Sequence, residues 1–383
     1  MERTLFKEEH HQLRQMVKDF IRDRVLPYYE TWEEAGVTPR DIWLEAGKNG
    51  LLCPTASYDF GGAEADFLSS MVIGEELYYH GTSSLFIHLH NDIVFPYLDN
   101  LGTPEQKERF IPKCVSGETI LALAMTEPDV GSDLAQLKTK AVKKGDHYVV
   151  NGSKTFISNG QLADLFIVAV RTDTEANPAH RGISLLAIEA NNPGLSKGRN
   201  LKKIGMHAQD TSEIFFEDCV VPVENLLGVE GKGFKHMMSQ LQQERLSLAI
   251  GAVAAAKGSL EETISYVKNR KAFGKNLSEF QNTRFELAEV ATKIQVTQSF
   301  IDDLIPRHIR GEVLTKEVSM AKYWATQTQF ETADRCLQLF GGYGYMKEYP
   351  ISRFFVDARV QCIYGGANEI MKELVARELL KDD

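Results

Sequence analysis

The sequence predicts an α+β protein with an N-terminal helical domain over residues 1–119, a middle antiparallel β domain over 120–228 and a C-terminal four-helix bundle over 229–383. Apolar residues recur at helical spacing in the first and last parts of the chain. Short apolar runs between turn residues fill the middle. Glycine-rich segments at 341–344 and 365–366 interrupt the last helical region. A chain of 383 residues is long enough for two or three such units.

The N-terminal part, from Lys7 to about Gly117, favours helices because its apolar residues follow helical spacing and long β-branched runs are scarce. One early stripe consists of Leu13, Val17, Phe20 and Ile21. Further along, Thr103 is a candidate N-cap, with Pro104 at the first helical position and Gln106 placed for a capping box. We therefore expect a helix to begin at Thr103.

The middle domain consists of short apolar runs bounded by turn residues. The predicted strands are His147–Val150, Leu165–Val170, Ile183–Ile188 and Glu213–Phe216. Asn151-Gly152 is predicted to be a hairpin turn. Because no helical segments separate the strands, parallel crossover connections are not expected.

Helical spacing returns after Gly231-Lys232-Gly233 and predicts long helices that pack as a bundle. Two stripes carry this prediction: Leu246, Ile250, Val253, Leu260, Ile264 and Val267, then Leu287, Val290, Ile294, Ile301 and Leu304. One helix should end near Leu339, and the last should run from Asn368 to Leu380.

Composition argues against several classes of function. The formal net charge of −10 and the isoelectric point near 5.6 disfavour nucleic acid and anionic membranes as partners, since both attract basic faces. No stretch approaches the roughly 18 apolar residues of a membrane span. His80, His88 and His90 suggest a metal site, but residues 88 and 90 point apart on a helix and no acidic partners support them.

The compartment is predicted from the cysteines and the first residues. The five cysteines are scattered, odd in number and never paired as C-x-x-C, so neither a disulfide framework nor a zinc site is indicated. The start of the chain lacks the apolar region of a signal peptide. We expect a bacterial cytoplasmic protein, although a mature mitochondrial matrix protein would look the same.

Two segments of the middle domain carry the first chemical signal. Residues 124–133 read Ala-Met-Thr-Glu-Pro-Asp-Val-Gly-Ser-Asp and resemble the flavin-binding signature of the acyl-CoA dehydrogenase family. By composition alone this segment is a turn, and Asp129-Val130 replaces the usual Gly-Ala. Residues 151–160 resemble the second signature, with Phe156 and Ser158 where many members have Trp and Thr. The resemblance implies FAD contacts from Leu123, Met125, Thr126, Gly131, Ser132, Phe156, Ile157 and Ser158.

The last domain carries three more segments of this resemblance. One resembles the clamp for the pyrophosphate and adenine of FAD, where arginine forks bind phosphate. A second resembles the loop that receives FAD from a partner subunit, and a third opens a helix whose N–H groups suit phosphate. The clamp residues are Arg270, Phe273 and Gln281. The loop residues are Gln338, Leu339, Gly341 and Gly342, and the residues at the helix start are Ala367, Asn368 and Glu369. In the family these motifs normally meet across subunits, so the resemblance implies a homotetramer.

Glu244 is the predicted catalytic base. Many family members carry this glutamate directly after the tyrosine of the last loop, but here Tyr364 is followed by Gly365-Gly366. In the long-chain and isovaleryl branches the base lies on the first long helix of the C-terminal domain, where this chain has Glu244-Arg245. A solvated helix carboxylate would be the ordinary interpretation of Glu244, but the absence of an acid at position 365 favours the base.

The resemblance covers essentially the whole chain and is closest to the long-chain acyl-CoA dehydrogenase type. It implies removal of a proton beside the thioester by Glu244, transfer of the neighbouring hydride to FAD, and stabilisation of the enolate by a backbone N–H near Gly365 and a ribityl hydroxyl of FAD. The implied substrate contacts are Ser132, Gly182, Ile183, Gln242, Gln243, Arg245, Gly365 and Gly366. Electron-transferring flavoprotein is the implied acceptor. Lys235 replaces an aromatic residue of relatives, and Asp129 has no evident role.

Other interpretations remain open at this point. The acyl group could be branched, as in isovaleryl-CoA or citronellyl-CoA, since those branches share the helix-borne base. An acyl-CoA oxidase would usually carry an extra C-terminal domain. A non-catalytic assembly partner with the same fold would be expected to lose Glu244 or the flavin motifs.

Overall fold

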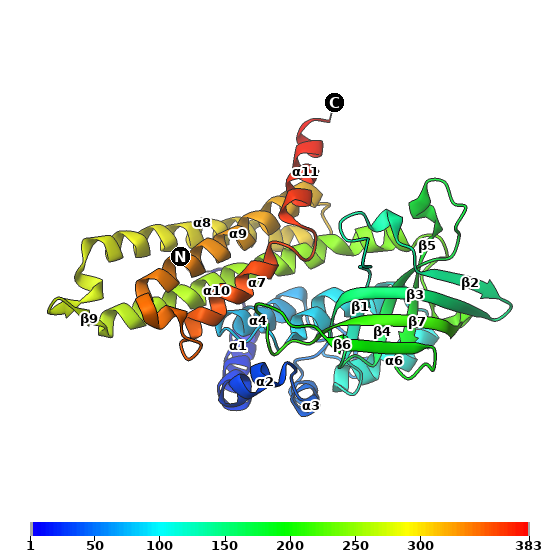
Figure 1. Cartoon of the computed structure of the whole chain (residues 1–383), viewed down its shortest axis with the longest axis horizontal. Coiled ribbons are helices and arrows are strands. Elements are labelled where there is room, and N and C mark those ends of the chain that lie inside the picture. Colours follow the sequence, from blue (N-terminus) through cyan, green and yellow to red (C-terminus); the bar gives the residue numbers. More distant parts are fainter. Residues whose placement is uncertain (1–2, 382–383) are drawn as a thin grey trace.

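The computed structural model describes residues 3–381 and contains a helical N-terminal part, a β domain and a long helical bundle (Figure 1). The N-terminal helices are α1 (Glu8–Phe20), α2 (Tyr29–Ala35), α3 (Arg40–Lys48), α4 (Phe67–Tyr79), α5 (Phe95–Leu101) and α6 (Pro104–Ser116). A π-helical segment, Leu89–Val94, leads directly into α5.

The predicted helix start at Thr103 is confirmed. Its side chain accepts a hydrogen bond from the backbone N–H of Gln106, whose own side chain accepts one from the N–H of Thr103. This reciprocal capping box fixes the start of α6, with Pro104 at the first helical position.

The middle domain is one eight-stranded sheet in the order β6-β7-β3-β2-β4-β5-β8, with β1 also paired to β4. Its strands are β1 (Leu121–Ala124), β2 (Lys140–Lys144), β3 (His147–Ser158), β4 (Leu165–Arg171), β5 (Ile183–Glu189), β6 (Leu195–Asn200), β7 (Thr211–Pro222) and β8 (Leu226–Leu227).

The sheet is mostly antiparallel, as predicted, but two pairings differ. β1 runs parallel to β4, and β2 meets β4 in parallel at one residue pair, Lys140 and Arg171. The chain passes from β1 to β4 through the β2–β3 hairpin and not through a helix, so a search for helical crossovers could not detect this pairing.

The predicted turn at Asn151-Gly152 is wrong. Both residues lie inside β3, where the register with β7 shifts between Val150 and Gly152. Gly152 has φ 147°, and a Cβ there would lie 2.7 Å from the Cα of Thr139. The glycine therefore marks a β-bulge and a close backbone approach, two alternatives to a turn for a glycine within a strand.

The C-terminal part consists of α7 (Gly233–Asn269), the short hairpin β9 (Lys271–Ala272) and β10 (Lys275–Asn276), α8 (Gln281–Ile309), α9 (Thr315–Phe340), α10 (Pro350–Gln361) and α11 (Asn368–Leu379). The predicted stripes of α7 and α8 face one core: Leu246, Ile250 and Val253 of α7 are buried with Val290, Ile294, Ile301 and Leu304 of α8. The β9–β10 hairpin projects at the end of the bundle away from the sheet (Figure 1).

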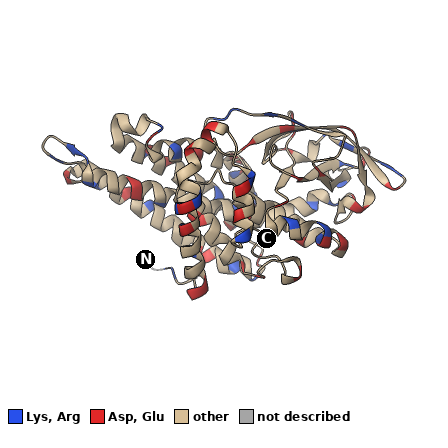
Figure 2. Ribbon diagram, turned by 90° about the horizontal axis from the view of Figure 1, so that it is seen from below, with Lys and Arg blue, Asp and Glu red and all other residues tan. Residues whose placement is uncertain are grey.

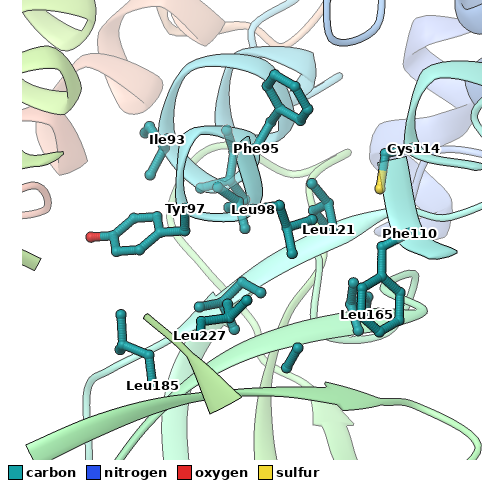
Figure 3. Packing of buried hydrophobic residues seen from close by; sticks show 14 of the residues in the cluster. Ile93, Phe95, Tyr97, Leu98, Phe110, Cys114, Leu121, Leu165, Leu185 and Leu227 are labelled. Atoms are coloured by element: carbon teal, nitrogen blue, oxygen red, sulfur yellow. The ribbon is translucent and has the colours of Figure 1, made fainter. Parts of the chain in front are cut away.

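A shared hydrophobic cluster joins the N-terminal helices to the sheet. Figure 3 shows Ile93, Phe95, Tyr97 and Leu98 of the α5 region above Leu121, Leu165, Leu185 and Leu227 of the strands. Met237 of α7 belongs to the same cluster, so all three parts of the chain contribute to it. This junction fixes the N-terminal half of α7 against its neighbours.

Acidic and basic residues are interspersed along the helices (Figure 2). Within residues 3–381 no helix is long and apolar enough to cross a membrane. The same described range holds no group of three or more His, Cys, Asp or Glu residues arranged to bind a metal ion.

Candidate active site

Glu244 lies on α7 in the interior, with 5% of its surface exposed. The hydroxyl of Tyr97, on α5, donates a 2.9 Å hydrogen bond to Oε1 of Glu244. Burial raises the pKa of Glu244 to about 7, while the Tyr97 hydrogen bond and the charge of Arg245 act in the opposite direction. A carboxylate that titrates near neutral pH suits general-base chemistry.

Two buried cations lie beside the glycine turn at 365–366. Arg245 is 8% exposed, and its Nε has no hydrogen-bond partner among the described residues. Lys322 of α9 is fully buried and donates to the carbonyl of Gly366 at 2.7 Å and to Oδ1 of Asn368 at 3.1 Å. Burial lowers the pKa of both groups, to about 8 for Lys322. Lys322 therefore ties this turn, and the start of α11, to the bundle.

The glycine turn packs against the part of α7 that carries Glu244. Gly365 and Gly366 have φ of 62° and 95°, the left-handed region that glycine tolerates. A Cβ at Gly365 would lie 2.2 Å from Cδ1 of Leu248, one helical turn after Glu244, and a Cβ at Gly366 would lie 2.7 Å from Cε of Met371. A side chain at position 365 would therefore need Leu248 to shift, on a left-handed backbone that favours glycine.

The two middle-domain signatures are hydrogen-bonded to each other. The N–H of Thr155 donates to the carbonyl of Thr126 at 2.9 Å, and Nζ of Lys154 donates to the carbonyl of Met125 at 3.0 Å. The segment after β1 therefore runs beside the end of β3, as one site requires.

A buried ion pair fixes the same segment. Lys154, which is fully buried, donates to Oε1 of Glu127 at 2.8 Å. The backbone N–H groups of Lys138 and Thr139 also donate to Glu127, at 2.6 and 2.9 Å. Burial lowers the pKa of Lys154 to about 8, whereas its charge and these hydrogen bonds outweigh burial and lower the pKa of Glu127. Both ends of the loop 127–139 are thus held by one carboxylate.

Near this loop, an exposed phenylalanine, Phe156, lies close to the hydroxyl residues Thr126 and Ser158. Phe156 is 68% exposed with φ 57°, although its neighbours Thr155 and Ile157 are buried. Thr126 and Ser158 are half-buried, as are Leu123 and Met125. An exposed aromatic in a constrained backbone, next to two hydroxyls, suits stacking and hydrogen bonding to a flat polar ring.

The remaining cofactor candidates lie elsewhere. The guanidinium of Arg270 lies 5.0 Å from the ring centre of Tyr343, and Phe273 is 97% exposed on the hairpin at the far end of the bundle (Figure 1). Basic residues mark this projecting hairpin in Figure 2. Gln338, Gly341 and Gly342 are exposed at the end of α9, and Gln281 is exposed at the start of α8.

The predicted cofactor residues at the start of α11 lie between the sheet and the far end of the bundle. Ala367 is the N-cap of α11, Asn368 is buried against Lys322, and Glu369 is exposed in the first turn. One copy of the chain therefore separates the predicted cofactor residues into a sheet group, an α11 group and a far-end group.

Several predicted substrate residues have other contacts. The Gln242 side chain donates to the carbonyl of Glu312 at 2.9 Å and accepts from the N–H of Leu314 at 2.7 Å, and it also contacts His308. Its amide is therefore committed to the junction of α7 with the α8–α9 turn. Gln243 donates to the carbonyl of Asp92 at 3.1 Å, which ties α7 to the π-helical segment.

Gly182 and Ile183 serve the packing of the sheet. A Cβ at Gly182 would lie 2.0 Å from the carbonyl oxygen of Asp173, and the Ile183 side chain is fully buried in the shared cluster. Their contact with substrate stays a prediction. Ser132 and Gly131 are exposed in the loop after β1 and remain accessible to a ligand.

Asp129 and Lys235, two positions that depart from the family pattern, are both on the surface. Nζ of Lys138 lies 3.0 Å from Oδ2 of Asp129, so the charge that interrupts the first signature is paired within its own loop. Lys235 is exposed in the first turn of α7.

Comparison with known proteins decides the family. The family models described as acyl-CoA dehydrogenase N-terminal, middle and C-terminal domains match residues 7–118, 122–219 and 231–380. The chain belongs to the acyl-CoA dehydrogenase family. Enzymes of this family are FAD-dependent oxidoreductases, and the exposed Phe156 with its neighbouring hydroxyls fits that cofactor.

Individual relatives cover nearly the whole chain. The long-chain specific acyl-CoA dehydrogenase of Rattus norvegicus is 48% identical, over 99% of this chain and 88% of the relative. The isobutyryl-CoA dehydrogenase of Dictyostelium discoideum is 38% identical, over 98% and 90%. The crystal structure of an acyl-CoA dehydrogenase from Geobacillus kaustophilus has a TM-score of 0.97 and 51% identity, over 99% of this chain and 100% of that chain.

Three residues of this acyl-CoA dehydrogenase site were not singled out from the sequence. Tyr97 gives no signal, because it lies 147 residues from Glu244 along the chain. Lys154 lies inside the second signature, but its burial is a tertiary property. Lys322 is detectable as a lysine between Val318, Ala321 and Ala325 on the apolar stripe of α9.

Proposed function

We propose that this chain catalyses the FAD-dependent α,β-dehydrogenation of a medium- to long-chain acyl-CoA to the trans-2-enoyl-CoA, with Glu244 as the base. The observation that carries the proposal is the buried Glu244 carboxylate, with a pKa raised to about 7, beside a turn that carries glycine and no acid at position 365.

Glu244 performs the proton step. Its carboxylate takes the proton from the carbon next to the thioester, and partial desolvation makes it basic enough to do so near neutral pH. The left-handed turn at Gly365 lets a thioester oxygen approach a backbone N–H, which stabilises the developing enolate. FAD, when bound, supplies the acceptor for the hydride that leaves the neighbouring carbon. The buried charges of Arg245 and Lys322 favour negative charge developing at this turn.

The flavin ring is assigned to Phe156, Ser158, Thr126 and the loop after β1. The far-end group around Arg270 and the end of α9 would hold the pyrophosphate and adenosine of FAD bound to another subunit. This division is the reason that we propose a homo-oligomer, with a tetramer expected. An electron-transferring flavoprotein is proposed as the acceptor of the electrons, as the resemblance implies.

The similarity to the rat long-chain enzyme supports a medium- or long-chain substrate. A branched acyl-CoA is the second candidate, because the isobutyryl-CoA dehydrogenase of Dictyostelium discoideum is also similar over nearly the whole chain. Each methylene contributes only about 1–3 kcal/mol to discrimination, so substrate preference needs direct measurement. A non-catalytic assembly role is disfavoured by the intact, buried Glu244.

The test is anaerobic bleaching of flavin absorbance by a panel of acyl-CoAs from butyryl to palmitoyl, with isovaleryl-CoA and citronellyl-CoA. Wild type, Glu244→Gln and Glu261→Gln are compared, since Glu261 is an exposed glutamate on the same helix. We expect the straight longer chains to bleach the wild type and the Glu261 variant but not the Glu244 variant. Bleaching of Glu244→Gln at the wild-type rate, or none in the wild type, contradicts the proposal.

A further inference from the structure

Tyr97 contacts the proposed base from a different domain. It lies on α5 of the N-terminal helical part, whereas Glu244 lies on α7. Its side chain is fully buried, and its hydroxyl donates to Oε1 of Glu244 at 2.9 Å. Within residues 3–381 it is the only hydrogen bond that the Glu244 carboxylate accepts, so Oε2 has no donor.

The ring of Tyr97 is held firmly. It belongs to the shared cluster with Ile93, Leu185, Leu227 and Met237. Figure 3 shows its hydroxyl oxygen directed away from the labelled side chains of this cluster. Because a packed aromatic ring has little rotational freedom, the hydroxyl has one position from which to orient the carboxylate.

Among the described residues, no other polar group near this part of α7 donates a hydrogen bond to the Glu244 carboxylate. Arg245, the adjacent charge, borders Gly366, where a Cβ would lie 3.6 Å from its Nη2. His88 and Asp92 are paired to each other at 3.2 Å. Their links to α7 run through the side chains of Gln243 and Ser247 and not through the Glu244 carboxylate. Tyr97 is therefore the group placed to control which carboxylate oxygen is free.

We propose that Tyr97 is a positioning residue for proton abstraction, holding Oε1 of Glu244 so that Oε2 is the oxygen that accepts the substrate proton. The α-carbon–hydrogen bond breaks, its electron pair stays on the substrate, the proton moves to Oε2, and Tyr97 keeps its own proton throughout. This inference rests on the proposed function of Glu244.

Tyr97→Phe removes the hydroxyl and keeps the ring. The hydrogen bond from Tyr97 lowers the pKa of Glu244, so its loss should raise that pKa. In the pH profile of the bleaching rate, the acidic limb should then move to higher pH by about one unit. The rate at high pH, where the base is ionised in both proteins, should also fall about tenfold because the carboxylate is no longer oriented. The substrate concentration for half-maximal rate should not change.

Tyr148→Phe is the matched control. Tyr148 is also fully buried, and its hydroxyl has no hydrogen-bond partner among the described residues. Its pH profile should match the wild type. Should Tyr97→Phe fail to fold or to retain flavin, 3-fluorotyrosine at position 97 decides the matter: a more acidic phenol is a stronger donor, so the acidic limb should move to lower pH.

The outcomes separate this inference from the proposed function. Loss of bleaching in Glu244→Gln together with a wild-type profile for the Tyr97 variants overturns the role of Tyr97 alone. Bleaching in Glu244→Gln overturns the role of Glu244 and, with it, this inference. A shifted limb and a lowered plateau in Tyr97→Phe, with Tyr148→Phe unchanged, support the positioning role.

Discussion

Two buried carboxylates of this acyl-CoA dehydrogenase differ in how many hydrogen-bond donors they have. Glu127, beneath the loop after β1, has donors on both oxygens: a fully buried lysine and two backbone N–H groups. Glu244, on α7, has one hydroxyl donor on one oxygen, and the neighbouring Arg245 does not pair with it. Each side chain is 5% exposed, although Glu244 lies deeper in the protein than Glu127.

This difference separates a structural charge from a reactive one. The hydrogen bonds and the lysine charge outweigh desolvation at Glu127 and lower its pKa, whereas desolvation dominates at Glu244 and raises its pKa to about 7. A carboxylate with donors on both oxygens fixes the backbone and stays ionised at neutral pH. An under-satisfied one is poised to accept a proton, and perturbed groups of this kind concentrate at functional sites.

The largest expected effect is on the rate of Glu244→Gln. Gln keeps the size and can still accept from Tyr97, but it cannot take a proton, so the rate of flavin bleaching should fall by about 10²- to 10⁴-fold. Rapid-mixing absorbance measures this directly. A fall of less than threefold would place the base elsewhere.

Lys154→Met should reduce stability more than any other single change considered for the loop. It leaves the Glu127 charge buried without its cation, at a cost of about 3–5 kcal/mol. Denaturant unfolding measures the change. In the double variant Lys154→Met/Glu127→Gln, which removes both charges, much of the loss should be recovered, and no recovery would mean that the pair acts through packing alone.

The raised pKa of Glu244 also predicts how the stability of the protein depends on pH. The folded-state pKa of Glu244 is raised from 4.5 to about 7, so the folded state binds its proton more tightly than the unfolded state, and stability contributed by this group is lost as pH rises from about 4.5 to about 7. The free energy of unfolding of Glu244→Gln should therefore rise relative to that of wild type between pH 4 and pH 8, by up to about 3 kcal/mol. Equal gains at both pH values, in denaturant titrations, would contradict the raised pKa.

The smallest effect belongs to an ion pair on the surface of the same loop. Asp129 and Lys138 lie 3.0 Å apart with 76% and 70% of their side chains exposed. Asp129→Asn should change stability by less than about 1 kcal/mol, and added salt should diminish the difference further. A loss comparable with that of Lys154→Met would show that the loop depends on its surface charge.

The sequence predicted what depends on local pattern. The capping box at Thr103, the long helices and the strands of the sheet follow from short-range spacing and are confirmed. Asn151-Gly152 was misinterpreted because the same dipeptide serves a turn or a bulge, and only pairing with β7 distinguishes them. The parallel contact of β1 with β4 likewise depends on long-range pairing.

The candidate site was predictable only in part, for a related reason. Glu244 could be proposed because a glycine stands at 365, but its burial comes from packing between α5, α7 and the glycine turn. Tyr97 reaches Glu244 across 147 residues, a contact that no periodicity reveals. Gln242 was grouped with the substrate contacts because it adjoins Glu244 in sequence; its amide bonds to the α8–α9 turn, and its contact with substrate stays a prediction.

The contact between Leu248 and Gly365 limits how this scaffold could change its chemistry. A Cβ at position 365 would meet Leu248 at 2.2 Å on a backbone with φ 62°. A glutamate acquired at 365 would therefore have to displace the Leu248 side chain and strain a turn that favours glycine, and losing Glu244 first removes the only proposed base. Moving the base from the helix to the loop is thus favoured only when positions 244, 248 and 365 change together, so the placement of the base should be a slowly changing, lineage-defining character.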